Sequence, residues 1–286
     1  MLVTMTKVKR VLADVIANFN DADGWAMASH VALSMMMALF PFLIFATAMA
    51  GFLGHEVRAS DMVDLVFATW PDQVAEPITR EIEAVLNGSH YGFLTVGIAL
   101  ALFFASNGVD AVRVALNRSY LVHEDRSFVF CRLQSLLFVI LGAIVLIVVS
   151  FLLVLVPLLS AFAEKAVPYL KEYETTFWFV RFCLAIFALA FALFASHAWL
   201  PAGRRPISDL WPGILATLVI WLAAAGLFAK YLENFADYGA TFAGLAGVMT
   251  AQIFLYLMAV ILILGGDLNA AILRIRTVRR TPAGQN

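Results

Sequence analysis

The chain has 286 residues, of which 63% are hydrophobic and 14% are charged, and its mean hydropathy is +0.89. This composition excludes an ordinary soluble domain and predicts a polytopic membrane protein. The formal net charge of -1 provides no basic field for nucleic acid, which argues against a nuclease or a regulator of transcription. Cys131 and Cys183 are too few and too differently placed for a disulfide framework, so we interpret both as packing residues.

Residues 1–27 predict an amphipathic helix on the cytoplasmic membrane surface and not a signal peptide. Basic side chains at Lys7, Lys9 and Arg10 are followed by apolar residues at helical spacing instead of a continuous apolar run. The spaced apolar residues are Val8, Val11, Leu12, Val15, Ile16 and Phe19.

The first span is expected at 28–54, with a kink at Pro41, because an internal proline lacks a backbone donor and clashes with the preceding turn. The acidic segment 55–90 predicts two short helices with apolar faces. We expect this segment to cover the outer ends of the spans, and a partner-binding role is the alternative.

The second span, at 91–109, is followed without a helix break by a polar face. Ser106, Asp110, Arg113 and Asn117 are spaced by four, three and four residues, which places them on one side of a helix. Two interpretations stay open. The face is either the helix leaving the bilayer with a local ion pair, or the wall of a water-accessible pocket between helices.

Four further spans complete an all-α protein with six transmembrane helices. Lys and Arg concentrate in the N-terminal segment, the loop after the second span, the turn after the fourth span and the tail. By the positive-inside rule, both termini are therefore expected in the cytoplasm. The four spans are expected at 133–160, 177–200, 210–229 and 243–272, which gives a transmembrane domain over 28–272 and a basic tail at 273–286.

Three motifs in fixed order connect this chain to a known family. They are Ala38-Leu39-Phe40-Pro41, Ala115-Leu116-Asn117 with Arg126 downstream, and Leu264-Gly265-Gly266-Asp267-Leu268-Asn269-Ala270. With the spacing of Leu200-Pro201, Trp211, Tyr231 and Tyr238-Gly239 before the last motif, the chain resembles the YihY/BrkB family of bacterial inner-membrane proteins, once labelled ribonuclease BN. The resemblance extends over roughly residues 10 to 275.

The resemblance implies six spans and a location in the bacterial inner membrane, so that segment 55–90 would be periplasmic. It leaves the activity poorly defined. The chain departs from the family pattern at Leu33 and Ser34, where many members have aromatic residues. It also has Asp267 where the family has Glu, which shortens the arm of that carboxylate.

Polar residues near the cytoplasmic ends of the spans are the candidate binding site. Each residue alone fits an interfacial side chain or a hydrogen bond between helices. Together they would line a vestibule in which Arg113 binds an anion or balances Asp110 and Asp267. The candidates are His30, Ser34, Asn107, Asp110, Arg113, Asn117, His197, Asp267 and Asn269.

A smaller outer set consists of Arg181, Lys230 and Glu233. Lys230 and Glu233 share a helical face and predict a local ion pair, with anionic headgroups as the alternative partner. Small residues at the start of the sixth span predict close helix packing, either within the monomer or in a homo-oligomer. The small-residue pairs are Ala240 with Gly244 and Ala243 with Gly247.

Catalytic templates are absent from the sequence. The five histidines show no metal-ligand spacing, and there is no P-loop, nucleophile elbow or dinucleotide fingerprint. We therefore expect no enzyme activity, no cofactor and no bound metal, and the ribonuclease label is rejected. The expected partners are membrane lipids, with no nucleic acid.

The leading hypothesis is a transporter-like or flippase-like protein that moves or binds a lipid or other amphiphile through a polar cavity on the cytoplasmic side. The alternative is a scaffold or envelope-integrity factor that does not transport and acts through protein partners. A packed interior would favour the scaffold, whereas a polar cavity would favour the transporter.

Overall fold

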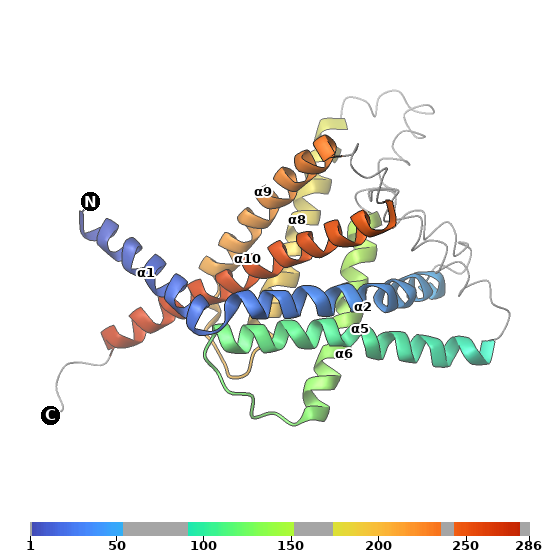
Figure 1. The fold of residues 1–286 in the computed structure, drawn as a ribbon, viewed down its shortest axis with the longest axis horizontal. Helices are drawn as coiled ribbons and strands as arrows, with labels where there is room; N and C mark the ends of the chain where they lie inside the picture. Colours follow the sequence, from blue (N-terminus) through green and yellow to red (C-terminus); the bar gives the residue numbers. More distant parts are fainter. Residues whose placement is uncertain (1, 54–90, 152–173, 236–242, 281–286) are drawn as a thin grey trace.

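The computed structural model describes residues 2–53, 91–151, 174–235 and 243–280 (Figure 1). These residues form helices and connecting loops, without strands. Six of the helices are long and apolar enough to cross a membrane, which confirms the predicted all-α, six-span fold. The helices are α1 (Leu2–Asp21), α2 (Gly24–Leu53), α5 (Tyr91–Ser119), α6 (Phe128–Ser150), α8 (Glu174–Trp199), α9 (Trp211–Phe235) and α10 (Ala243–Arg280), with a short 3-10 helix, η3 (Ile207–Asp209).

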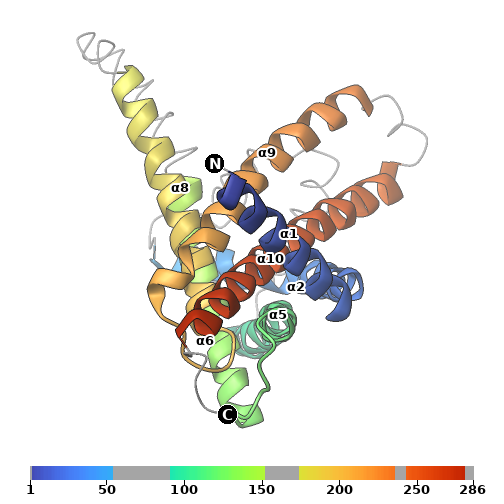
Figure 2. The same cartoon turned by 90° about the vertical axis from the view of Figure 1, so that its left-hand side faces the viewer.

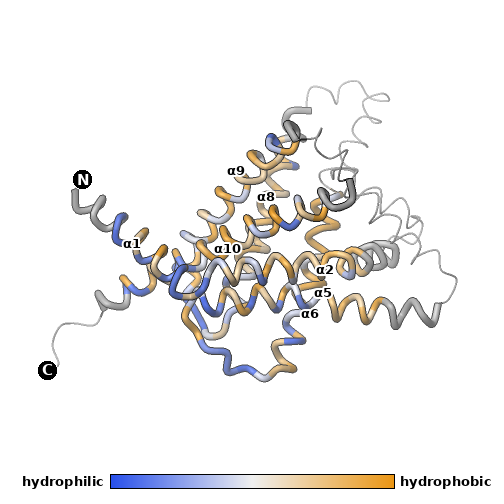
Figure 3. Tube along the Cα trace, viewed as in Figure 1, coloured by the Kyte–Doolittle hydropathy of each residue, from blue (hydrophilic) through white to orange (hydrophobic). Residues whose placement is uncertain are grey.

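The start of α1 and the end of α10 lie on the same side of the helices as two short connections, the α5–α6 loop (120–127) and the α8–α9 turn (200–210) (Figure 1). We call this the terminal side. Polar residues gather there, while the spans away from it are apolar (Figure 3). The expected assignment of this side to the cytoplasm stays a prediction, and segment 55–90 lies outside the described residues.

Helix α1 forms where the amphipathic pattern predicts it, but its apolar face is divided. Val15 and Phe19 are buried, and α1 packs against α10 and α2. Leu12 and Ile16 are exposed on the same helix. This division fits a helix that covers protein on one side and meets lipid on the other.

Several helices continue past the limits expected from hydropathy. Helix α2 runs from Gly24 to Leu53 through Pro41. Helix α5 keeps its helical form through the polar face as far as Ser119. Helix α6 begins at Phe128, because the hydroxyl of Ser127 accepts a hydrogen bond from the Phe130 N–H and caps the first turn (3.3 Å).

The helices α8 and α9 are anchored mainly at the terminal side. The largest buried apolar cluster joins residues of α8, α9 and α10 with residues of α1, α2 and α5 at this end. Farther out, Phe187 on α8 is 69% exposed and Leu227 on α9 is 70% exposed. In both views the outer parts of α8 and α9 diverge from α10 (Figures 1 and 2).

Close contact between α9 and α10 depends on two glycines. A Cβ atom at Gly213 would collide with the backbone oxygen of Gly265 and with the Asn269 side chain, and one at Gly265 would collide with Thr217. Glycine therefore lets the two backbones approach. The small-residue pairs predicted from the sequence lie farther from the terminal side than this contact. Ala240, a member of the first pair, is outside the described residues.

The substitution Gly213→Ala is expected to destabilise the protein by about 1–3 kcal/mol, because the added methyl group has no space beside α10. Gly226→Ala is the matched control on the same helix, since a Cβ there meets nothing within 4 Å. Thermal unfolding of the purified variants measures both effects. Equal melting temperatures for the two variants would contradict the close contact.

Candidate functional site

Polar side chains at the terminal side form two groups. The first, which we call the Glu124 network, fills the space between the end of α5, the α5–α6 loop and the α8–α9 turn. The second, the Asp267–Asn269 cluster, surrounds α10. The Glu124 network comprises Asp110, Arg113, Asn117, Glu124, Arg126 and Gln134, and the Asp267–Asn269 cluster comprises Asn18, Ser119, Tyr120, His197, Thr217, Asp267 and Asn269.

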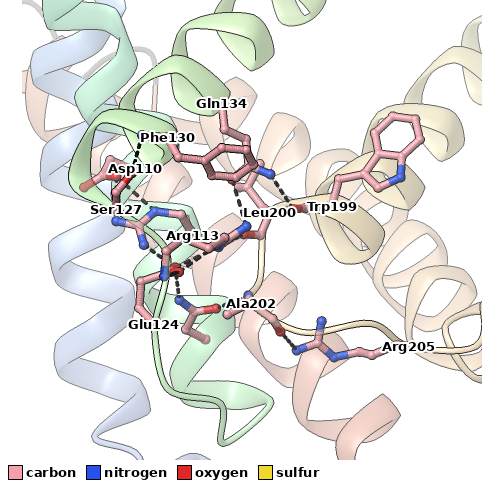
Figure 4. Close-up of polar contacts among 12 residues, drawn as sticks. Asp110, Arg113, Glu124, Ser127, Phe130, Gln134, Trp199, Leu200, Ala202 and Arg205 are labelled. Carbon is pink, nitrogen blue, oxygen red and sulfur yellow. Dashed lines mark hydrogen bonds and ion pairs between the residues drawn. The ribbon is translucent and has the colours of Figure 1, made fainter.

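In the Glu124 network, two guanidinium groups and one amide converge on a single carboxylate (Figure 4). Arg113 donates to Glu124 Oε2 at 2.5 Å, and Asn117 Nδ2 donates to the same oxygen at 2.8 Å. Arg126 donates to Glu124 Oε1 at 2.6 Å. Arg113 also binds Asp110 at 2.8 Å, so two positive charges face two negative ones.

The same network holds the end of α8 (Figure 4). Arg126 donates to the Leu200 carbonyl at 2.8 Å, and Gln134 donates to the Trp199 carbonyl at 2.5 Å. Asn117 Oδ1 accepts the Ala202 N–H at 2.7 Å. The contacts of Arg126 and Gln134 satisfy carbonyl groups that the helix end leaves without partners, and that of Asn117 satisfies an N–H of the turn.

Charge in the Glu124 network is fixed by its hydrogen bonds. The bonds from Arg126, and then from Asn117 and Arg113, hold the pKa of Glu124 well below its usual range, against the opposing effect of burial. Glu124 in turn raises the pKa of Arg126. The network therefore stays ionised, and we assign it a structural role.

In the Asp267–Asn269 cluster, two polar residues of α10 face different neighbours. Asp267 Oδ1 accepts hydrogen bonds from Asn18 and from the Ser119 hydroxyl (2.7 Å). Asn269 Oδ1 accepts the Gly213 N–H at 2.7 Å, which satisfies a donor in the first turn of α9. The α10 helix is thereby joined to α1, α5 and α9.

A hydrogen-bond chain leads from Asn269 to the end of α8. Asn269 Nδ2 donates to the Tyr120 hydroxyl at 3.1 Å, and that hydroxyl lies 2.9 Å from His197 Nδ1. Burial raises the pKa of Tyr120 to about 12, so the hydroxyl keeps its proton. Because the hydroxyl oxygen already accepts from Asn269, we assign its proton to the bond with His197 Nδ1. The neutral ring must then carry its own proton on Nε2.

Three polar atoms of this cluster are buried without a hydrogen-bond partner in the part of the chain that the structure describes. They are Asp267 Oδ2, His197 Nε2 and Thr217 Oγ1. Each such atom costs about 1–3 kcal/mol. In contrast to the Glu124 carboxylate, this cluster has unused hydrogen-bonding capacity on side chains of α8, α9 and α10.

The predicted residues fall into three sets. Asp110, Arg113 and Asn117 belong to the Glu124 network. His197, Asp267 and Asn269 belong to the cluster around α10. His30 is exposed and Ser34 half-buried on α2, and Asn107 accepts a hydrogen bond from Arg132 (2.8 Å) on an exposed surface, all three outside the two groups.

Two side chains of the outer set, Arg181 and Lys230, belong to the described part of the chain. Arg181 lies 5.5 Å from the ring of its neighbour Phe182, and Lys230 is exposed on α9. The side chain of Glu233 is outside the described part, so its pairing with Lys230 stays a prediction.

Sequence reasoning missed Glu124, Arg126 and Tyr120 as members of these groups. Membrane topology alone explains a basic loop, and this gave no reason to examine the carboxylates within it. The available signal was the position of Glu124, which lies between Arg118 and Arg126 directly after the polar face of α5.

The substitution Glu124→Gln is expected to destabilise the protein by about 2–4 kcal/mol at pH 7, because it leaves Arg113 and Arg126 without their shared carboxylate. Since the pKa of Glu124 is lowered by folding, its contribution is complete above the ordinary carboxyl value and is lost as the pH falls below about 4.

Thermal unfolding at pH 7 and at lower pH measures this difference, which should shrink on acidification. Asp125→Asn, at an exposed position in the same loop, is the control. A stability gap that does not depend on pH would contradict the assigned role of the ionised carboxylate.

The chain is similar to two curated proteins over most of its length. It is 26% identical over 259 residues to YfkH, a protein of Bacillus subtilis (strain 168) named as ribonuclease-like, with 91% of this chain and 94% of that protein covered. It is 24% identical over 256 residues to a UPF0761 membrane protein of Alteromonas mediterranea, with 86% and 81% covered. No solved structure gives a significant match. Residues 15–286 match the family described as Virulence factor BrkB, which confirms the resemblance seen in the motifs, and the chain is an integral membrane protein of the BrkB family.

Proposed function

We propose that this membrane protein binds and moves a lipid or other amphiphile, with the Asp267–Asn269 cluster as its site. The observation that carries this proposal is the set of buried, unpartnered atoms on Asp267, His197 and Thr217. Such atoms are costly in a membrane interior, where no solvent can satisfy them. A polar headgroup, water or ion bound in another state would satisfy them.

The packing of α8 and α9 supports a movement that opens the site. Their buried residues lie near the terminal side, and the Glu124 network holds the turn between them. A rotation of these two helices about the turn would separate Gly213 from Asn269 and bring Thr217 to the opening. The same movement would leave the Glu124 network intact, so that it would act as the pivot.

The remaining candidates enter the proposal as parts of the path. His30, Ser34 and Asn107 would line the approach on the terminal side, and Arg181, Lys230 and Glu233 would contact headgroups on the opposite side. The proposal places the protein in the bacterial inner membrane with both termini in the cytoplasm. It involves no enzyme activity, no nucleic acid and no cofactor, and association between copies through small-residue helix faces would be compatible with it.

A scaffold or envelope-integrity factor is the second candidate function. The observation in its favour is the burial of Asp267, which is 0% exposed and bonded to α1 and α5. A protein that only holds partners would keep this interior permanently closed. A transporter must open it during its cycle.

The substitution Asp267→Asn is expected to lower lipid movement at least about tenfold, because it replaces the carboxylate oxygen that we assign to the site with an amide. The assay is the movement of a fluorescent phospholipid between leaflets of proteoliposomes. Asp125→Asn is the control, since it makes the same chemical change at an exposed position. Equal rates in all three proteins would remove the cluster from the mechanism, and no protein-dependent movement in the wild type would leave the scaffold as the function.

The accessibility of position 217 to a thiol reagent distinguishes an interior that opens from one that stays closed. On a background without Cys131 and Cys183, Thr217→Cys is expected to react with a membrane-impermeant thiol reagent from the terminal side, more slowly than a control cysteine at exposed Arg204. The slow reaction reports the fraction of time that the site is open. Complete protection at position 217, with normal labelling at 204, would contradict the opening movement.

A further inference from the structure

The α8–α9 turn contains a guanidinium group without a carboxylate partner in the described part of the chain. Arg205 donates to the Ala202 carbonyl at 2.8 Å, and its guanidinium lies 4.0 Å from the centre of the Tyr120 ring. Its second terminal nitrogen, NH1, is buried and has no hydrogen-bond partner there. In contrast, Arg113 and Arg126 bind Glu124.

The charge of Arg205 is therefore not balanced locally. The Glu124 network is neutral, because its two carboxylates match its two guanidinium groups. Burial, and then the nearby charge of Arg126, lower the pKa of Arg205, although a guanidinium remains protonated in proteins. A half-buried positive charge in this position favours an anion.

A second unused donor belongs to a residue that contacts the same tyrosine. His197 carries its proton on Nε2, since Nδ1 accepts the Tyr120 hydroxyl, and Nε2 is buried without a partner among the described residues. Arg205 and His197 both contact Tyr120, the first over its ring at 4.0 Å and the second at its hydroxyl at 2.9 Å. Two unpartnered N–H groups next to one tyrosine suit an acceptor with several oxygens.

The aromatic residues around the turn place it at the depth of lipid headgroups. Trp199, which ends α8, is 53% exposed, and Trp211, which begins α9, is 47% exposed. Tryptophan is enriched at membrane–water interfaces, where its ring is apolar and its N–H is hydrated. Ile207 in the same turn is also exposed, which fits contact with lipid.

We propose that Arg205 and His197 Nε2 bind the phosphate group of an anionic phospholipid at the α8–α9 turn. This inference rests on the proposed function and names the headgroup class that the protein takes. The planar guanidinium presents parallel donors that match two phosphate oxygens, and His197 supplies a third donor from α8. The acyl chains would extend along the exposed apolar faces of α8 and α9.

The test measures lipid retained by the purified full-length protein in native mass spectrometry, with equal amounts of phosphatidylglycerol and phosphatidylcholine supplied. The wild type is expected to retain phosphatidylglycerol in preference. Arg205→Gln should lower that retention about tenfold, because the paired donors are lost. Arg205→Lys should give an intermediate loss, since the charge remains without the planar fork.

Arg204→Gln is the matched control, because it removes the same charge from the exposed neighbouring residue. Retention by this variant should stay within about twofold of the wild type, as expected for a screened surface charge. An equal loss in the Arg204 and Arg205 variants would overturn the site, because it would show attraction by diffuse surface charge. Unchanged retention in Arg205→Gln would also overturn it.

Two further measurements keep the inference testable. Thermal stabilisation of the wild type by phosphatidylglycerol, absent with phosphatidylcholine, is expected even if an Arg205 variant does not fold, and its absence would overturn the assignment of a lipid to the site. If inorganic phosphate binds through Arg205 and phosphatidylglycerol does not, the phosphate site stands with a soluble ligand. If Arg205→Gln loses lipid binding but lipid movement persists, this site is separate from the proposed transport function. If the wild type moves lipid but shows no preference for phosphatidylglycerol, the site alone is refuted.

Discussion

The hydrogen bonds of the Glu124 carboxylate hold together parts of the chain that membrane lipid cannot stabilise. Three helices end or begin around this residue, and the polar groups at their ends have to find partners within the protein. Glu124 meets this requirement by orienting Arg126 and Asn117, which bind the carbonyl of Leu200 and the N–H of Ala202. The positions of α8 and α9 relative to α5 and α6 depend on this arrangement.

The two polar groups differ in how completely their hydrogen-bonding capacity is used. Around Glu124, charges are paired and the carboxylate is saturated by donors. Around α10, neutral contacts through Tyr120 and Asn269 leave atoms of Asp267 and His197 unused. A rigid support beside an unsatisfied group is the arrangement expected where a site must keep its geometry while its neighbours move.

Hydropathy predicted the six spans because each apolar run is long enough to be recognised without reference to its neighbours. The Asp110–Arg113 pair was likewise predictable, since its members are one helical turn apart. The division of the candidates into two groups was not predictable. It depends on contacts such as Asn269 with Tyr120, 149 residues away in sequence, and on the relative rotation of helices that a single sequence does not specify. Glu124 was missed because its loop already had a sufficient explanation in membrane topology.

The contact between Asn18 and Asp267 joins residues that are 249 positions apart. Helix α1 leaves the ribosome before the six spans, whereas its partner on α10 belongs to the sixth of them. Helix α1 therefore cannot complete its packing until α10 has been made, and it must wait at the membrane surface while the spans between them insert. Its exposed apolar residues, Leu12 and Ile16, give it a surface on which to do so. Docking of α1 against α10 thus follows the synthesis of all six spans.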